Sequence, residues 1–281
     1  MRTTWDFTDN IIARAEFRHQ RYLIETSRSP SGWIALAVVM LVPALLTSVI
    51  LFGVGALGLD VRPFFAPTGT WHGNLARIGG FALLTMNIAL YLVVLLITLG
   101  LASNSITREH RSKNWDILLL TNVNARQLVW GKWWASLQAL WGDHVIVALL
   151  RLGLVGAVIA FHENRLPPGV LGLSPELTHL ISITAIMLVF TLLDAAFSTA
   201  MGVAIPLSNW SSAVVGAVVF ALRAFTLFLA LWFANEIRLA LINDGPYLLI
   251  AIGGLVGFAG ATWLALVIAQ VIAVRGQVSP S

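Results

Sequence analysis

The chain has 281 residues, of which 58% are hydrophobic and only 11% are charged. A soluble domain carries about a quarter charged residues, so one soluble core of this size cannot hide so much apolar surface, and a bilayer is the more favourable solvent. The net charge of +4 does not indicate nucleic-acid binding, because the basic residues are few and form no long run. Cysteine is absent, which excludes disulfides, thiolate metal sites and a cysteine nucleophile.

The polar N-terminal segment, 1–32, predicts an amphipathic helix from Asn10 to Thr26. Charged residues share one arc of its helical wheel and apolar residues share another. This division favours an interfacial helix with its apolar side in the headgroup boundary, and the alternative is a helix that only anchors the first span. The charged arc holds Arg14, Arg18, Arg21 and Glu25, and the apolar arc holds Ile11, Ile12, Ala15, Tyr22 and Leu23.

Six apolar stretches follow, each longer than the roughly 20 residues that a helix needs to cross about 30 Å of hydrocarbon. Helix is the expected state, because a backbone in lipid must satisfy its own hydrogen bonds. The fold class is therefore an all-α membrane protein, with residues 1–281 forming a single transmembrane domain. Spans one and two occupy 33–103, and spans three to six occupy 133–274. The spans are Trp33–Leu59, Ile78–Ser103, Trp133–Phe161, His179–Ile205, Ser211–Ala234 and Tyr247–Val274.

Proline and glycine add detail to these spans. Pro43 should kink the first span, and Pro206 should end the fourth. Small residues in spans three and six predict close helix packing, within one chain or at a seam between two chains. These residues are Gly153 and Gly156 in span three and Gly253, Gly257 and Gly260 in span six.

Lysine and arginine residues are distributed unevenly between the two sides of the membrane that the six spans would cross. Eleven lie on the side of both termini and of the polar segment 104–132, and four lie on the other side. The positive-inside rule therefore places both termini and that segment in the cytoplasm. We expect an integral protein of the cytoplasmic membrane, with the lipid bilayer as its constant partner.

The polar segment 104–132 predicts a helical hairpin. Asn114 is suited to cap a short helix, and Asn124, with Gln127 three residues later, indicates a second helix start. Between them stand four consecutive apolar residues, 117–120, which favour a partner surface or lipid. The alternative is a solvated loop with an ordinary interfacial helix.

Two patterns lie in this segment and at the N-terminus. The segment is close to R-E-x-x-x-G-T-x-E-x-L-L-x-T-P followed by a G-K pair, and the N-terminus loosely matches N-P-[VI]-[LI]-x-R-E-[LF]-R. The matching residues are Arg108-Glu109, Asp116, Leu118-Leu119, Thr121 and Gly131-Lys132 in the segment, and Asn10, Ile12, Arg14, Glu16, Phe17 and Arg18 at the N-terminus. The chain departs from the patterns at Ile11, Ala15, Lys113-Asn114 and Asn122. With its six spans, the whole chain resembles the permease subunits of type-two ABC exporters.

This resemblance implies that the segment 104–132 is a coupling segment, seated in a groove of a cytoplasmic ABC ATPase. Glu109 and Asp116 would be its acidic contacts, with Arg108 and Arg111 as their partners. Leu118, Leu119 and Thr121 complete the coupling residues. Such permeases work as pairs, so a second permease chain, identical or related, is expected.

The chain itself shows no signature of catalysis. Gly131-Lys132 lacks the other residues of a Walker motif, and neither H-E-x-x-H nor G-x-S-x-G occurs. We therefore expect a non-catalytic subunit without a cofactor or metal of its own, and ATP and magnesium belong to the partner ATPase. Two other functions stay open. One is a non-transporting membrane subunit that anchors or assembles a larger complex. The other is a membrane enzyme, which the missing catalytic residues disfavour.

Five ionisable residues fall inside the predicted spans. Each costs roughly 2.5–3.5 kcal/mol at depth, so each should be paired or face water. Similar depths favour an ion pair between Asp194 and Arg223. The functional alternative is a polar lining of a substrate path or a proton relay. The five are Asp143, His144 and Arg151 in span three, Asp194 in span four and Arg223 in span five.

Overall fold

A computed structural model describes most of the chain, and all regular structure in the part described is helical. Six of these helices are long and apolar enough to cross a membrane, which indicates an integral membrane protein. The ranges described are 10–27, 37–59, 71–111, 124–161, 175–208, 212–243 and 245–278, with the isolated residues Gly32 and Ala35. The α-helices are α1 (Ile11–Ser27), α3 (Val42–Ala56), α5 (Trp71–Arg111), α7 (Ala125–Ala139), α8 (Trp141–Phe161), α9 (Pro175–Ala204), α10 (Ser212–Ile242) and α11 (Tyr247–Val278).

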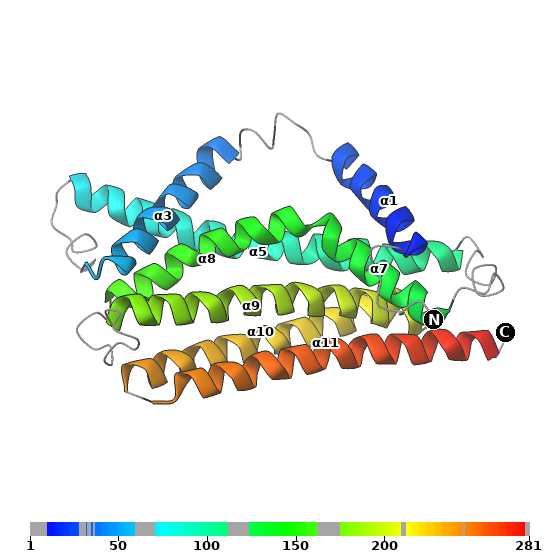
Figure 1. Cartoon of the computed structure of the whole chain (residues 1–281). Helices are drawn as coiled ribbons and strands as arrows, with labels where there is room; N and C mark the ends of the chain where they lie inside the picture. Colours follow the sequence, from blue (N-terminus) through cyan, green and yellow to red (C-terminus); the bar gives the residue numbers. More distant parts are fainter. Residues whose placement is uncertain are drawn as a thin grey trace.

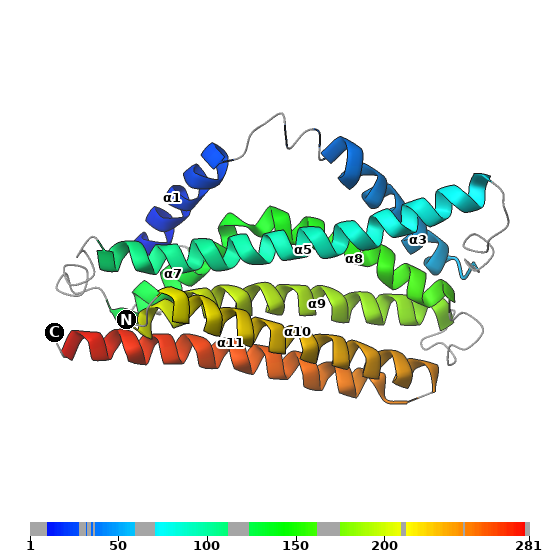
Figure 2. The same ribbon diagram turned by 180° about the vertical axis from the view of Figure 1, so that it is seen from behind.

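The long helices form an elongated bundle. Helices α5, α9, α10 and α11 run side by side along its length, while α3 inclines across α8 (Figures 1 and 2). Helix α1 leans against α7 at one end of the bundle, where α11 also ends (Figure 1). We call this end the α1 end. It carries the last turns of α5 and the first turns of α7, which flank residues 112–123.

The third predicted span, Trp133–Phe161, is wrong as one continuous helix. The chain breaks at Leu140, where φ is −109° and ψ is 13°, so residues 133–139 belong to α7. The two pieces have different partners, because α7 packs on α1 and α8 packs on α3. Asp143 lies in the first turn of α8, where the helix dipole favours a negative charge.

Four other helices, α5, α9, α10 and α11, extend beyond their predicted spans, α5 and α10 by the most. The second span continues beyond Ser103 to Arg111, and the fifth continues beyond Ala234 to Ile242. Beyond Ser103 the added residues are mostly polar, whereas beyond Ala234 charged residues alternate with apolar ones, so the predicted spans were too short in both cases.

One of the two predicted proline effects, at Pro206, is confirmed, and the kink at Pro43 stays a prediction. A π-helical stretch, Ala37–Leu41, precedes α3, and Pro43 stands in the first turn of α3. Proline has no N–H to donate to the preceding turn, so a change of helix type at this point is expected. The fourth span ends as predicted, because α9 gives way to a short 3-10 turn that contains Pro206.

Helices α3 and α8 cross at very close range. A Cβ atom at Gly156 would lie 2.4 Å from the carbonyl oxygen of Leu51, and one at Gly153 would lie 2.4 Å from the Cα of Ser48. The Ser48 hydroxyl also accepts from the Gly153 N–H (2.8 Å) and donates to the Leu149 carbonyl (2.6 Å). The prediction of close packing is thus confirmed for the glycines of span three.

The glycines of span six behave differently. A Cβ atom at Gly253, Gly257 or Gly260 would meet no atom within 4 Å among the residues described. Among the described residues, therefore, no neighbouring element packs closely against these three glycines. A seam between two chains stays a prediction.

These two groups of glycines give a matched test. We expect Gly156→Ala to lower the free energy of unfolding by about 1–3 kcal/mol, because the added methyl group forces two backbones apart. Gly253→Ala should be neutral or slightly stabilising, because its methyl group enters open space and alanine favours helix. Unfolding of both purified variants in mixed micelles measures the difference. Equal effects at the two positions would contradict the close crossing.

Candidate functional site

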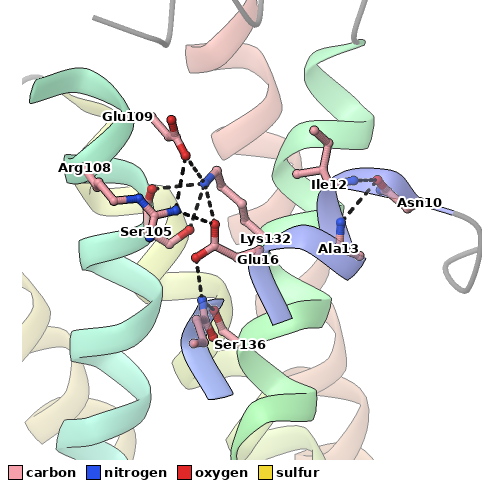
Figure 3. A network of polar contacts seen from close by, with 10 residues as sticks. Asn10, Ile12, Ala13, Glu16, Ser105, Arg108, Glu109, Lys132 and Ser136 are labelled. Atoms are coloured by element: carbon pink, nitrogen blue, oxygen red, sulfur yellow. Dashed lines mark hydrogen bonds and ion pairs between the residues drawn. The ribbon is translucent and has the colours of Figure 1, made fainter. Parts of the chain in front are cut away.

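The α1 end holds a buried polar network centred on Lys132 of α7, whose side chain is 1% exposed (Figure 3). Its ammonium group donates to Glu16 of α1 at 3.1 Å and to Glu109 of α5 at 3.3 Å. It also donates to the hydroxyl and the carbonyl oxygen of Ser105, both at 3.0 Å. One lysine therefore joins three helices that are distant in sequence.

Arg108 completes the charge balance of this network. Its guanidinium donates to Glu16 at 2.8 Å and to Glu109 at 3.3 Å. Two cations and two carboxylates then meet, and each carboxylate faces both cations. Buried ions are stable only when they are paired and hydrogen-bonded in this manner. We call Glu16, Ser105, Arg108, Glu109 and Lys132 the Lys132 network.

Gln20, one turn after Glu16 on α1, extends the polar contact between α1 and α7. Its side-chain nitrogen donates to Glu16 at 3.1 Å and to the hydroxyl of Ser136 on α7 at 2.9 Å. Glu16 and Gln20 are both buried, so α1 turns a polar stripe toward the bundle. Ile11 and Tyr22, from its predicted apolar arc, are mostly exposed. The interfacial placement of α1 stays a prediction.

The stability that Glu16 contributes to the fold depends on pH. Burial raises the pKa of this carboxyl, but Lys132, Arg108 and the hydrogen bond from Gln20 outweigh burial, and the net pKa lies below the ordinary value of 4.5. A lowered pKa means that Glu16 stabilises the fold fully above pH 4.5. That stabilisation disappears as the pH falls through the folded-state value.

We therefore expect the stability difference between the natural protein and Glu16→Gln to depend on pH. The difference should be largest at neutral pH and should shrink as the pH falls below about 4.5, where Glu16 itself becomes neutral. Thermal unfolding of both proteins in micelles, from pH 7 to pH 3, measures it. A difference that does not change over this range would show that Glu16 is not ionised in the fold.

The start of α1 is fixed by Asn10. Its side-chain oxygen accepts from the backbone of Ile12 (3.0 Å) and Ala13 (3.4 Å), and its nitrogen donates to the Gln127 carbonyl at 2.8 Å. A Cβ atom at Gly131 would lie 2.8 Å from the Asn10 side chain. Glycine at position 131 thus allows α1 to approach α7 closely. The next residue, Lys132, binds Glu16 of α1.

The structure brings only some of the predicted coupling residues together. Arg108 and Glu109 belong to the Lys132 network, with Arg108 on its exposed edge. The predicted second helix start is confirmed, because the Asn124 side chain accepts from the Arg126 N–H at 3.0 Å. The remaining coupling residues, Asp116, Leu118, Leu119 and Thr121, lie outside the described residues, as does most of the predicted hairpin.

A second polar cluster lies near the middle of the long helices. The predicted ion pair between Asp194 of α9 and Arg223 of α10 is present, and both residues are 5% exposed. The hydroxyl of Tyr91 on α5 lies between them, since it donates to Asp194 at 2.9 Å and accepts from Arg223. Three helices are thereby joined inside the apolar bundle.

Arg151 of α8 approaches the same tyrosine from another side. Its guanidinium lies 4.9 Å from the centre of the Tyr91 ring and 5.9 Å from that of Phe190. It donates to the hydroxyl of Thr191 at 2.7 Å. His144 lies two turns before Arg151 on α8, with a buried ring nitrogen that has no partner among the described residues. Asp143 lies beside it in the first turn of α8. We call Tyr91, Arg151, Asp194 and Arg223 the Tyr91 cluster.

The sequence analysis missed several members of these sites. Tyr91 is a lone aromatic residue within an apolar span, and no local pattern distinguishes it. Glu16 carried a signal, because it lies off the charged arc of its helix and four residues before Gln20. Lys132 was noted as half of the Gly131-Lys132 pair of the family pattern and as part of an incomplete Walker motif, and neither observation predicted its buried ion pairs.

No three histidine, aspartate or glutamate side chains converge as metal ligands within the described ranges. Comparison of the chain with protein-family models, with curated proteins and with solved structures finds no match. The two polar groups of residues are therefore interpreted from their own geometry.

Proposed function

We propose that the chain is the permease subunit of an ATP-driven ABC exporter of the type-two class. ATP and magnesium would be bound by a separate cytoplasmic ATPase, and this chain would be the non-catalytic part that moves substrate across the cytoplasmic membrane. A second permease chain, identical or related, would complete the transport unit. Both termini and residues 104–132 would then lie in the cytoplasm.

The convergence of the family-like residues is the observation that carries this proposal. Glu16 belongs to the N-terminal pattern, Arg108-Glu109 to the loop pattern and Gly131-Lys132 to the G-K pair that follows it, which lies within α7. The N-terminal stretch is far from the other two in sequence, yet residues of all three meet in the Lys132 network. A chance match to degenerate patterns would not explain why these residues lie together, whereas a fold shared with the family would.

The network also suggests how force would pass from an ATPase to the membrane helices. Residues 112–123 connect α5 with α7, and the network ties the adjoining ends of these helices to α1. A partner that moves this connection would therefore displace α1, α5 and α7 as one unit. Helix α5 carries that displacement to Tyr91, and α7 passes it through the break at Leu140 to α8. Packed elements transmit such shifts because they are not continuously deformable.

Co-purification tests the proposal. We expect the full chain, purified from its native membranes, to bring down an ABC ATPase. Asp116→Lys or Leu118→Asp should abolish the association while the permease stays folded. The same changes should also abolish any ATPase stimulation by the permease. Arg21→Gln, on the exposed side of α1, is the matched surface control and should have no effect.

Two results would overturn the proposal. One is a folded chain that never associates with an ATPase. The other is a stable complex with unrelated membrane subunits and no nucleotide-binding protein. That second result would instead establish the anchoring or assembly role.

A further inference from the structure

The Tyr91 cluster has more hydrogen-bond donors than acceptors. Among the described residues, the Nε of Arg223 and the side-chain nitrogen of Asn87 are buried without a partner. Asn87 stands one helical turn before Tyr91 on the same side of α5. Such buried orphans are rare in folded proteins, and each one calls for an occupant or a water molecule.

Arg151 adds further donors to the same place. A guanidinium has five N–H groups and no acceptor, and the contacts of Arg151 with Thr191 and Tyr91 use only part of them. Thr191 in turn donates its own proton to the Met187 carbonyl at 2.8 Å. The cluster contains one carboxylate, that of Asp194, which already accepts from Arg223 and Tyr91.

Two guanidinium groups thus flank one tyrosine, with a single carboxylate between them. Arginine binds carboxylate and phosphate oxygens through paired N–H groups, and it does so best away from bulk water. Arg223 is buried, whereas Arg151 is only half-buried and can be reached from the outside of the bundle. The exposed residues next to the cluster along three helices are apolar, namely Leu92, Leu149 and Leu192.

We propose that the cluster around Tyr91 binds the oxyanion group, carboxylate or phosphate, of an amphipathic molecule. Arg151 and Asn87 contact the oxyanion, and Arg223 faces it from the buried side. The apolar part of the molecule lies against the neighbouring leucines. Calling this molecule the transported substrate rests on the proposed function, whereas the binding itself does not.

Binding to the purified full-length chain in neutral maltoside micelles tests the proposal, with no ATPase present. Dodecyl phosphate and dodecanoate are the amphipathic probes, inorganic phosphate is the soluble probe, and dodecanol is the uncharged control. We expect the natural chain to bind the charged amphiphiles and not dodecanol. Binding of inorganic phosphate, lost in the same variants, would identify a soluble oxyanion as the source instead of a lipid-like one.

Three variants separate a binding site from a structural role. Arg151→Gln should weaken binding at least tenfold. Arg238→Gln, an exposed arginine outside the cluster, removes the same charge and should leave binding unchanged. Asn87→Ala should weaken binding severalfold without lowering the unfolding temperature, because it deletes a donor that has no partner in the free protein. If Asn87 were purely structural, Asn87→Ala would lower the unfolding temperature and leave binding unchanged.

The proposal is overturned if none of the oxyanions binds, since water would then satisfy the donors. It is also overturned if Arg151→Gln and Arg238→Gln weaken binding equally, or if dodecanol binds as well as dodecyl phosphate. A negative result here leaves the ATPase association intact, and loss of that association leaves oxyanion binding intact. The two proposals therefore fail independently.

Discussion

Lys132→Met is expected to lower the free energy of unfolding by about 3–5 kcal/mol, because it leaves two carboxylates with too few cations in a buried site. Glu16 and Glu109 would lose the fully buried cation and retain their ion pairs with Arg108, whose side chain is 40% exposed. Methionine replaces the volume of the lysine stem, so a cavity contributes little to the loss. Equilibrium unfolding of the purified variant in mixed micelles measures the effect.

A double-mutant cycle identifies the cause of this loss. Adding Glu16→Gln to Lys132→Met removes one of the stranded charges, so the double variant should be less destabilised than the sum of the single variants. Arg21→Gln is the control, because its partner Glu25 and the arginine itself are both exposed, and its effect should stay within about 0.5 kcal/mol. Simple additivity of Lys132→Met and Glu16→Gln would contradict the network.

The second large effect is expected at Arg223. Arg223→Gln strands the Asp194 carboxylate inside the bundle and should cost about 3–5 kcal/mol of unfolding free energy. Asp194→Asn should cost a similar amount, because it strands the guanidinium instead. Both variants can be measured by the same unfolding assay.

The combination of these two changes is the informative one. Asp194→Asn with Arg223→Gln leaves two neutral amides that are able to hydrogen-bond with Tyr91 and with each other, so the double variant should recover much of the loss. Arg238→Gln, on an exposed part of the same helix, should have little effect. Independent losses that add in the double variant would show that the ion pair does not hold α9 and α10 together.

Much of the fold could be predicted from the sequence, because the bilayer imposes strong rules. Apolar length located six spans, and the structure contains six helices that meet the same criteria. The helix near the N-terminus and the ion pair between Asp194 and Arg223 were also predicted. Each of these follows from a local pattern or from the cost of an isolated charge in lipid.

The remaining features depend on contacts between distant residues, which no local pattern contains. The break at Leu140 separates α7, which packs mainly on α1, from α8, which packs mainly on α3, and no proline or glycine at residue 140 marks it in the sequence. Lys132 finds partners on α1 and α5, and its surroundings in sequence gave no sign of them. Glu109 was expected to contact an ATPase, which stays a prediction, and its hydrogen bond with Lys132 was not foreseen.

Site-specific cross-linking tests the central claim most directly, and the absence of natural cysteines makes it free of background. A single cysteine at position 118 should cross-link to an ATPase subunit in native membranes, and the yield should change with nucleotide. A single cysteine at position 169, which the charge distribution places on the opposite side of the membrane, should not cross-link. A folded protein whose residue 118 never reaches a nucleotide-binding partner, or reaches only other membrane subunits, would contradict the account.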